Sequence, residues 1–298
     1  MSREPRVDLA LDPEAVLGLL RGVLQADACS VRLLKRKRRR LVVLYELESG
    51  DSHTRVVGKW FSTDRGAVVA EELSSLRALG FAGPELAVPA LVVYVADVRA
   101  LFVEAIEGPL LRELLRAQPS ETARAGAWLA AFHGSALAIP RSCGPAKQVK
   151  SVARWAREQP RLEELRTELQ AALLSIPDPG RPVHYDYRDS QVVTPAGGPT
   201  TVLDFDEAGM GDPSFDVAHF DAHLDLLALH RYGNPTALSD ARRAFHAGYE
   251  RMAPLPPRRP ELQAFAWFKV AYQGLRREAD EREWGYALGE VQRSLSVA

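Results

Sequence analysis

The hydrophobic pattern of the first hundred residues predicts one amphipathic helix followed by an antiparallel sheet. Apolar residues recur with helical period over residues 16–24, and Asp12, Pro13 and Glu14 before them form a typical helix start. A second helical pattern covers residues 67–79 and ends at Gly80. Short runs rich in β-branched and apolar residues, separated by turn-forming stretches, occupy residues 31–34, 41–47, 55–61, 91–95 and 101–106. This order predicts a five-stranded sheet, with its first three strands in an antiparallel meander, and one main helix.

After Gly108 the pattern becomes mainly helical. Helices are expected over residues 110–116, 120–137 and 151–176, and the last third is again helical except for the proline-rich stretch 254–260. The sequence therefore predicts an α+β fold with two lobes. The N-terminal lobe would span residues 1–107 and the C-terminal lobe residues 108–298.

Composition limits the classes of partner. The chain has 298 residues, of which 46% are hydrophobic and 26% charged, with a formal net charge of −1. This balance gives no reason to expect nucleic acid or an anionic membrane as a partner, and no run of 18 apolar residues predicts a membrane span. The first residues lack the pattern of a signal peptide, and Cys29 and Cys143 are too far apart for a metal-type spacing. A cytoplasmic protein is expected, and the pattern does not indicate its oligomeric state.

The candidate chemistry lies in two short segments. Asp186 stands five residues before the amide side chain of Gln191, and Asp204 and Asp206 follow after a short loop. This spacing is typical of phosphoryl transfer, in which one carboxylate orients a hydroxyl while an amide oxygen and a second carboxylate hold magnesium. The alternatives are that Asp186 caps a turn and that Gln191 is a loop residue bonded to backbone.

Around these segments the chain resembles the aminoglycoside phosphotransferase and choline kinase superfamily, which is related to protein kinases. The resemblance runs from about Val31 to His223. It is strongest at residues 183–193 and 202–218, where an acid-x-acid pair precedes Gly-Asp-Pro and a further aspartate. It implies a bilobal, protein-kinase-like fold that uses ATP or GTP with Mg²⁺. The implied reaction moves the γ-phosphate to a hydroxyl of an aminoglycoside, sugar or amino alcohol.

The resemblance also assigns roles to single residues of the C-terminal lobe. Asp186 matches the catalytic aspartate, and Asp204 matches the metal-binding aspartate. Gln191 stands where the family usually has asparagine, and its amide oxygen is a donor suited to Mg²⁺. Three further residues have supporting roles: His184 braces the loop, Asp216 holds the backbone of the catalytic loop, and Asp206 either approaches the metal or fixes its own loop.

In the N-terminal lobe the resemblance points to a nucleotide site. Lys59 matches the lysine that contacts the α- and β-phosphates, with Glu72 as its expected partner and Glu71 as the alternative. Residues 102–108 resemble the hinge between the lobes, where backbone groups of Glu104 and Ile106 would bind the adenine edge. The alternative readings are a surface lysine and an edge strand that enters a turn.

Several features leave the function open. The basic run at residues 35–40 is expected to form a solvated hairpin turn, and it lacks the glycines that many kinases place over the phosphates. Together with Gln191 it favours a competing hypothesis, a kinase-like binding or regulatory module with little catalysis. The acidic residues within 278–283 could receive a polycationic acceptor or could form a solvated helix face. His219 and His223, one helical turn apart, would share a face, but two histidines fall short of a zinc site.

Overall fold

The structure is a computed structural model that describes residues 6–37 and 39–298. Residues 1–5, considered above for a signal peptide, and Arg38 of the basic run lie outside the described residues. The chain divides into two compact units. Unit 1 comprises the described residues up to Gly108 together with Pro195–Asp206, and unit 2 comprises Pro109–Thr194 and Glu207–Ala298. Segment Pro195–Asp206 comes from the part of the sequence that was assigned to the second lobe.

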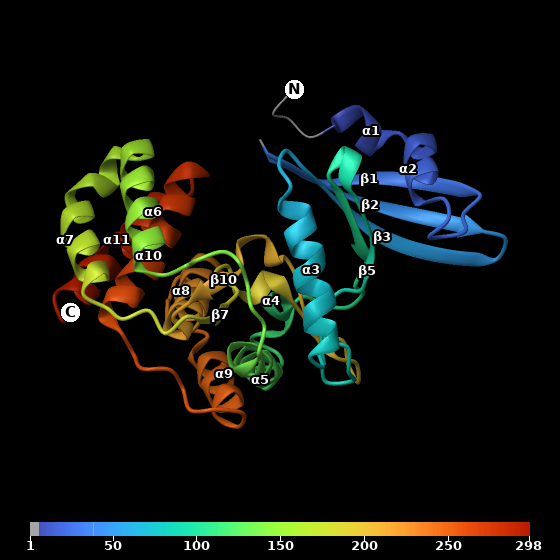
Figure 1. Cartoon of the computed structure of the whole chain (residues 1–298). Helices are drawn as coiled ribbons and strands as arrows, with labels where there is room; N and C mark the ends of the chain where they lie inside the picture. Colours follow the sequence, from blue (N-terminus) through green and yellow to red (C-terminus); the bar gives the residue numbers. More distant parts are fainter. Residues whose placement is uncertain (1–5, 38) are drawn as a thin grey trace. The chain divides into compact units, whose positions relative to one another are not determined.

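A five-stranded antiparallel sheet forms the centre of unit 1 (Figure 1). Its strands, in the order β1-β2-β3-β6-β5, are β1 Ala28–Lys37, β2 Arg40–Ser49, β3 Ser52–Phe61, β6 Ala100–Glu104 and β5 Leu91–Val95. The register places Lys59 of β3 between Val42 of β2 and Leu101 of β6. Because β3 is an interior strand, Lys59 is fixed by neighbours on both sides.

Helices cover both faces of this sheet. The short helices α1 Val7–Leu11 and α2 Pro13–Leu20 pack on one face, and the carboxylate of Asp12 caps α2 through the backbone N–H of Glu14 at 3.0 Å. The Trp60 indole donates to the Tyr45 hydroxyl at 2.8 Å, and that hydroxyl donates to the Ala10 carbonyl at 2.7 Å. A buried chain of hydrogen bonds therefore anchors α1 to the sheet.

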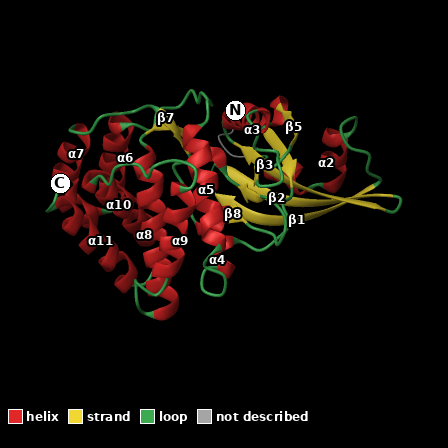
Figure 2. Ribbon diagram, turned by 90° about the horizontal axis from the view of Figure 1, so that it is seen from below, coloured by secondary structure: helices red, strands yellow, loops and turns green. Residues whose placement is uncertain are grey.

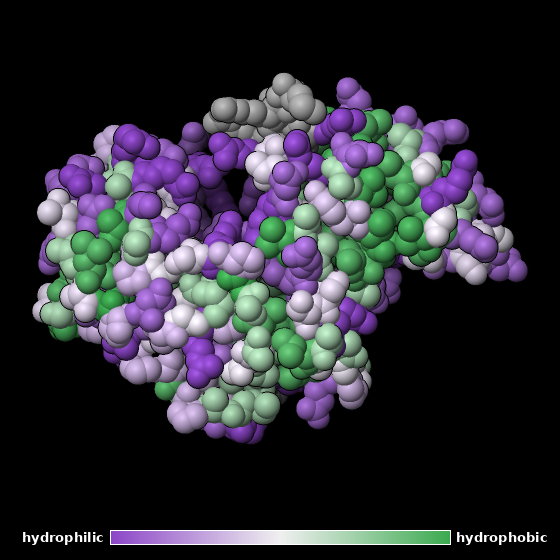
Figure 3. All heavy atoms as spheres, viewed as in Figure 1, coloured by the Kyte–Doolittle hydropathy of each residue, from purple (hydrophilic) through white to green (hydrophobic). Residues whose placement is uncertain are grey.

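Helix α3 Arg65–Ala78 packs against β3, β5 and β6. A parallel pair, β4 Leu86–Ala87 with β9 Thr200–Val202, joins segment 195–206 to the rest of unit 1. On the face shown in Figure 3, hydrophobic residues gather in the region of the sheet, surrounded by hydrophilic ones. The 3₁₀ turn η1 Ala96–Val98 connects β5 to β6.

Unit 2 is mainly helical (Figure 2). Its helices are α4 Leu111–Leu114, α5 Glu121–Gly134, α6 Pro145–Glu158, α7 Glu163–Leu174, α8 Pro213–Tyr232, α9 Ser239–Glu250, α10 Pro260–Arg276 and α11 Glu281–Leu295. Its short elements are η2 Pro160–Leu162, β7 Arg181–Val183, η3 Asp189–Gln191, β8 Val192–Val193 and β10 Gly209–Gly211. The single helix expected over residues 151–176 is interrupted, because Pro160 cannot donate the hydrogen bond that would continue α6.

A large hydrophobic core of unit 2 lies between α6, α7, α8, α10 and α11, with buried side chains from all five helices. Tyr185, which precedes the candidate catalytic aspartate, packs in this core with its ring 4.6 Å from that of Phe215 on α8. The candidate catalytic segment is therefore held by the core on one side. No helix within the described ranges has the length and apolar character needed to cross a membrane.

Candidate active site

In unit 1 the two acidic residues of segment 195–206 meet two cations of the sheet. The Lys59 ammonium lies 2.8 Å from Asp204 Oδ1 and 2.9 Å from Asp206 Oδ1. Arg40 binds the Asp204 carboxylate with two nitrogens, at 2.8 and 3.3 Å, and also forms an ion pair with Asp206. All four side chains are at most about one-fifth exposed. Such charges are retained inside a protein when they are paired in this way.

The pairing decides the protonation states in this cluster. Burial opposes ionisation of Asp204, but the charges of Lys59 and Arg40 outweigh it and hold the pKa of Asp204 well below its usual range. Burial lowers the pKa of Lys59, an effect that the Asp204 carboxylate offsets in part. Asp204 is therefore a carboxylate at neutral pH and can act as an oxygen ligand.

The backbone at Asp204 is unusual for a residue with a side chain. Its φ is +64°, in the left-handed region that non-glycine residues rarely adopt. Arg65 at the start of α3 holds the following residues by donating to the carbonyls of Phe205 at 2.8 Å and Asp206 at 3.0 Å. Strained backbone that is held by its surroundings is characteristic of functional sites.

The structure gives Lys59 and Glu72 different partners from the expected ones. The carboxylate of Glu72, which is 2% exposed, accepts two hydrogen bonds from the Arg65 guanidinium, at 3.0 and 3.2 Å. Lys59 binds the two aspartates instead. Because Arg65 also holds the segment after Asp204, Glu72 fixes that segment indirectly.

Arg40, like Arg65, is a residue of unit 1 that sequence reasoning missed. The basic run was expected to be a solvated turn, but its first residues belong to β1 and Arg40 is the first residue of β2. Its side chain is 10% exposed and points at Asp204, 164 positions away in the sequence. One signal was present: Arg40 directly precedes the apolar run 41–47, so it was the basic residue closest to the core.

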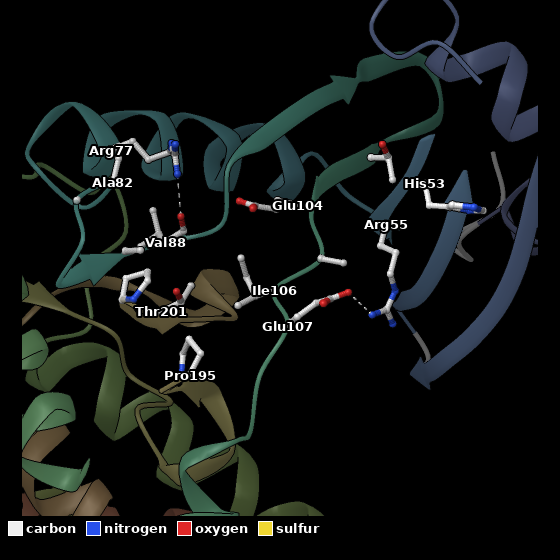
Figure 4. A pocket seen from close by; sticks show the side chains of 15 residues that line it. His53, Arg55, Arg77, Ala82, Val88, Glu104, Ile106, Glu107, Pro195 and Thr201 are labelled. Carbon is white, nitrogen blue, oxygen red and sulfur yellow. Dashed lines mark hydrogen bonds and ion pairs between the residues drawn. The ribbon is translucent and has the colours of Figure 1, made fainter. Parts of the chain in front are cut away.

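The hinge segment of unit 1 lines a pocket of about 710 Å³ (Figure 4). Glu104 and Ile106 lie in its wall, and Arg55 pairs with Glu107 at 2.7 Å at one end. The N–H of Glu104 already donates to the Ala90 carbonyl at 2.9 Å. In the described chain the N–H of Ile106 has no backbone partner, so it is the better donor for a ligand. Lys59 is not in the pocket wall.

In unit 2 a buried aspartate holds the candidate catalytic loop. The carboxylate of Asp216 on α8 accepts hydrogen bonds from the backbone N–H groups of His184 at 2.6 Å and Tyr185 at 2.8 Å. It also lies 3.1 Å from His133 Nε2 on α5. Tyr185 has a φ of +64°, so these bonds stabilise a backbone conformation that would otherwise be costly. The loop is fixed immediately before Asp186.

Asp186 lies among nitrogen donors. Arg188 Nη2 is 3.4 Å from Asp186 Oδ2, Gln191 Nε2 is also 3.4 Å from that oxygen, and Lys269 Nζ is 3.8 Å from Oδ1. These contacts are long, so none of them ties up the carboxylate as a short ion pair would. Lys269 on α10, which sequence reasoning missed, is itself anchored by the Tyr185 carbonyl and by Glu207 at 3.1 Å.

The two residues proposed as magnesium ligands are each described within their own unit. Gln191 turns its amide nitrogen toward Asp186, so its amide oxygen is not engaged there. Asp204 supplies an ionised carboxylate. Hard oxygen ligands of this kind fit Mg²⁺, which binds proteins through one or two carboxylates together with substrate phosphates. The described residues contain no group of three or more His, Cys, Asp and Glu side chains arranged to hold a metal.

The acidic residues near the C-terminus have structural partners. Asp280 caps α11 by accepting from the backbone N–H of Arg282 at 2.8 Å, and Glu283 lies 2.5 Å from His230 Nδ1. These contacts favour the reading of residues 278–283 as a helix start with a solvated face rather than as a receptor for a polycation.

Comparisons with known proteins agree with this architecture. A family model described as the phosphotransferase enzyme family matches residues 45–255. The choline kinase from Streptococcus pneumoniae has a TM-score of 0.64 at 16% identity, and the match covers 96% of this chain and 99% of that one. Aminoglycoside phosphotransferase APH(4)-Ia has a TM-score of 0.63 at 15% identity, with 95% and 97% covered.

A third similar structure is the choline kinase from Cryptosporidium parvum Iowa II, with a TM-score of 0.66 at 11% identity and coverage of 95% and 94%. No curated protein matches the chain. At these identities the similar structures show the fold alone. They confirm the predicted α+β, bilobal, protein-kinase-like fold.

Proposed function

The chain belongs to the phosphotransferase enzyme family, and from this premise we propose that it transfers the γ-phosphate of ATP or GTP to a hydroxyl of a small molecule. The observation that carries the proposal is the cluster in which Lys59 and Arg40 meet Asp204 and Asp206. A cation for nucleotide phosphates beside an ionised metal-binding carboxylate is the arrangement that phosphoryl transfer requires.

Unit 1 would bind the nucleotide. Lys59 would contact the α- and β-phosphates, Glu72 would support the site through Arg65, and backbone groups of Glu104 and Ile106 would hold the adenine edge. Asp204 and Gln191 would hold Mg²⁺, which neutralises charge that develops on the phosphates during transfer. One similar structure is described as a complex of APH(4)-Ia with AMP-PNP and hygromycin B, which supports nucleotide use by this fold.

Unit 2 would perform the chemistry at the acceptor. The Asp186 carboxylate would accept a hydrogen bond from the acceptor hydroxyl and take its proton as transfer proceeds. The hydroxyl oxygen forms a bond to the γ-phosphorus while the bond from that phosphorus to the β–γ bridging oxygen breaks, which releases the nucleoside diphosphate. Asp216 and His184 would keep the loop in place, and Asp206 would remain paired with Lys59 and Arg40.

The competing function is a kinase-like binding or regulatory module. It is favoured by Gln191 at the usual asparagine position and by the glycine-free basic hairpin. The experiment that separates the two measures magnesium-dependent consumption of ATP and GTP against sugars, aminoglycosides and amino alcohols. A phosphotransferase should lose turnover by about 10²- to 10⁴-fold in Asp186→Ala, with an unchanged circular dichroism spectrum.

Asp240→Ala is the matched control, because Asp240 is a largely exposed aspartate on the surface of α9. It should retain full turnover. If the wild-type protein fails to bind Mg-ATP and Mg-GTP at millimolar concentration, the phosphotransferase proposal is wrong. If it binds nucleotide but no variant of Asp186 alters turnover, the binding module is favoured.

A further inference from the structure

Lys269 of α10 is a buried cation next to the candidate catalytic aspartate. Only 2% of its side chain is exposed, and its ammonium lies 3.8 Å from Asp186 Oδ1 and 3.1 Å from Glu207 Oε2. Lysine is almost never buried to this extent unless its charge is paired. All three residues belong to unit 2, so the arrangement is internal to one unit. The pairing places a fixed positive charge beside the carboxylate that the proposed function uses as its base.

The same ammonium holds the backbone of the candidate catalytic loop. Lys269 donates a hydrogen bond to the Tyr185 carbonyl, and its nitrogen lies 4.8 Å from the centroid of the Tyr185 ring and 5.7 Å from that of Phe215. A cation over aromatic faces is attracted by the electrons of the rings. Asp216 accepts from the N–H of Tyr185 at 2.8 Å, so both backbone polar groups of Tyr185 are engaged by side chains. Asp186 follows directly and is held by these contacts.

The two oxygens of Asp186 have different surroundings. Oδ1 is buried and accepts no hydrogen bond from the described chain. Lys269 at 3.8 Å is too distant to donate to Oδ1 but close enough to stabilise its negative charge. Oδ2 lies 3.4 Å from both Arg188 Nη2 and Gln191 Nε2. The Asp186 side chain is 14% exposed, and Oδ1 contributes almost none of that surface. Oδ2 is therefore the oxygen left to meet an acceptor hydroxyl.

From these contacts we infer that Lys269 is a positioning residue for the proposed phosphoryl transfer. It holds Asp186 with Oδ1 directed inward, so that Oδ2 receives the proton of the acceptor hydroxyl. The inference rests on the proposed function and adds a residue to it. Lys269 itself is buried against α8 and the loop, so it acts through Asp186 and not by touching the acceptor.

The charges around Lys269 stay balanced through the transfer step. The O–H bond of the acceptor breaks and its proton goes to Asp186 Oδ2, while the oxygen bonds to the γ-phosphorus. The bond from that phosphorus to the β–γ bridging oxygen breaks, and its electron pair leaves with the nucleoside diphosphate. Asp186 then has no charge to offer Lys269. Glu207, whose side chain is 51% exposed, remains as the anion that pairs with the buried ammonium.

The test measures magnesium-dependent turnover in Lys269→Met, which keeps an unbranched side chain but removes the charge. The acceptor is the member of the sugar, aminoglycoside and amino alcohol panel with the highest turnover, and folding is checked by circular dichroism. We expect kcat to fall by about 10- to 100-fold, because the base is no longer held in position. The KM values for Mg-ATP and for the acceptor should change by less than about threefold, since Lys269 touches neither.

Lys150→Met is the matched control, because Lys150 is an exposed lysine on α6 and should keep the kcat and KM of the wild type. A double variant then tests whether Lys269 acts through Asp186. Lys269→Met introduced into Asp186→Ala should lower the residual turnover by less than about threefold, since residues that act as a unit are not additive. A purely structural lysine would cost the same factor in both proteins.

Glu207→Gln is a second route that leaves the core unchanged, so the test stays decisive if Lys269→Met fails to fold. Without Glu207, protonation of Asp186 would leave the buried ammonium with no carboxylate, so transfer should become harder. We expect kcat to fall by about tenfold with both KM values unchanged, because the interaction matters only once the proton moves. Glu250→Gln, at an exposed glutamate that ends α9, should behave as the wild type.

The outcomes separate this inference from the proposed function. If Lys269→Met raises the KM of the acceptor and leaves kcat unchanged, the lysine binds the acceptor and the positioning role is refuted while the phosphotransferase stands. Wild-type kcat in both Lys269→Met and Glu207→Gln refutes it in the same way. If the wild-type protein binds Mg-ATP but turns over no acceptor of the panel, the proposed function fails and the positioning role falls with it.

Discussion

Replacing Asp216 by asparagine tests whether the catalytic loop depends on a buried carboxylate. Asp216 is fully buried and accepts two backbone N–H groups, from His184 at 2.6 Å and from Tyr185 at 2.8 Å. Asparagine has nearly the same shape but a single acceptor oxygen. In Asp216→Asn one of the two N–H groups must therefore face an amide NH₂, which can only donate.

The magnitude follows from the type of hydrogen bond. A bond to a charged group contributes about 1.5–3 kcal/mol, and a buried donor left unsatisfied costs about 1–3 kcal/mol more. In the variant, one hydrogen bond from a backbone N–H is lost, the other is weakened because its acceptor is no longer charged, and the first N–H is left without an acceptor. Together these changes predict a loss of about 3–5 kcal/mol in the free energy of unfolding. Because domains are stable by about 5–15 kcal/mol, this is a large fraction of the total. Turnover that depends on Asp186 should fall at least tenfold, since the loop shifts.

The assay is urea denaturation followed by tryptophan fluorescence. Asp189→Asn is the matched control, because Asp189 is also a buried aspartate of this loop but binds a side chain, Arg112, instead of backbone N–H groups. Burial raises the pKa of Asp189, so its charge is less well stabilised and its removal should cost about 2 kcal/mol or less. Equal losses in the two variants would refute the role assigned to the backbone contacts of Asp216.

Three further predictions concern stability. Arg40→Gln should destabilise unit 1 by about 2–4 kcal/mol in urea denaturation, because it leaves the paired carboxylate of Asp204 short of one buried cation; a loss below 1 kcal/mol would contradict the pairing. Burial raises the pKa of Asp225 to about 6, which means that the folded state favours the protonated carboxyl. This stabilisation of the folded state is fully present below pH 3.8 and is lost as pH rises through about 6. As pH rises from about 4 to 7, the free energy of unfolding of Asp225→Asn should therefore increase by about 3 kcal/mol relative to that of the wild type. A difference between the two proteins that does not change with pH would refute the pKa shift. Gly126→Ala should cost at least about 2 kcal/mol, since its Cβ would lie 2.0 Å from a backbone carbonyl of α9, whereas Gly134→Ala, with open space around it, should change stability by less than about 1 kcal/mol.

Local patterns were sufficient for the elements that carry the site. Short runs of β-branched and apolar residues between turns predicted all five strands of the unit 1 sheet, and helical periodicity predicted its main helix. The Asp-Pro-Glu start of α2 was also predicted from the sequence. These signals depend on residues that are close together in the sequence, so they can be recognised without knowledge of the fold. The missed break at Pro160 belongs to the same class, because the proline was visible and its missing N–H ends a helix.

Partners distant in sequence could not be read in this way. The basic run contains several lysines and arginines, and nothing local distinguishes Arg40, whose carboxylate partner lies 164 positions away. The same holds for Lys269, which reaches the catalytic loop from 84 positions away. Glu72 was expected to pair with Lys59, but Arg65, seven residues away on the same helix, was a nearer cation and takes the pairing. Charge pairs depend on tertiary approach, and a sequence lists several equivalent candidates for each.

The charge balance of the unit 1 cluster gives Arg40 a specific part in the proposed function. In the structure two cations are matched by the two carboxylates of Asp204 and Asp206. If Asp204 serves as a magnesium ligand, it can no longer satisfy both Lys59 and Arg40. Asp206 alone would then serve both cations, and the triphosphate that accompanies the metal is the anion that would balance the second positive charge. Arg40 would then contribute by side chain what glycine-rich loops contribute by backbone N–H, which explains how a hairpin without glycine is compatible with nucleotide binding.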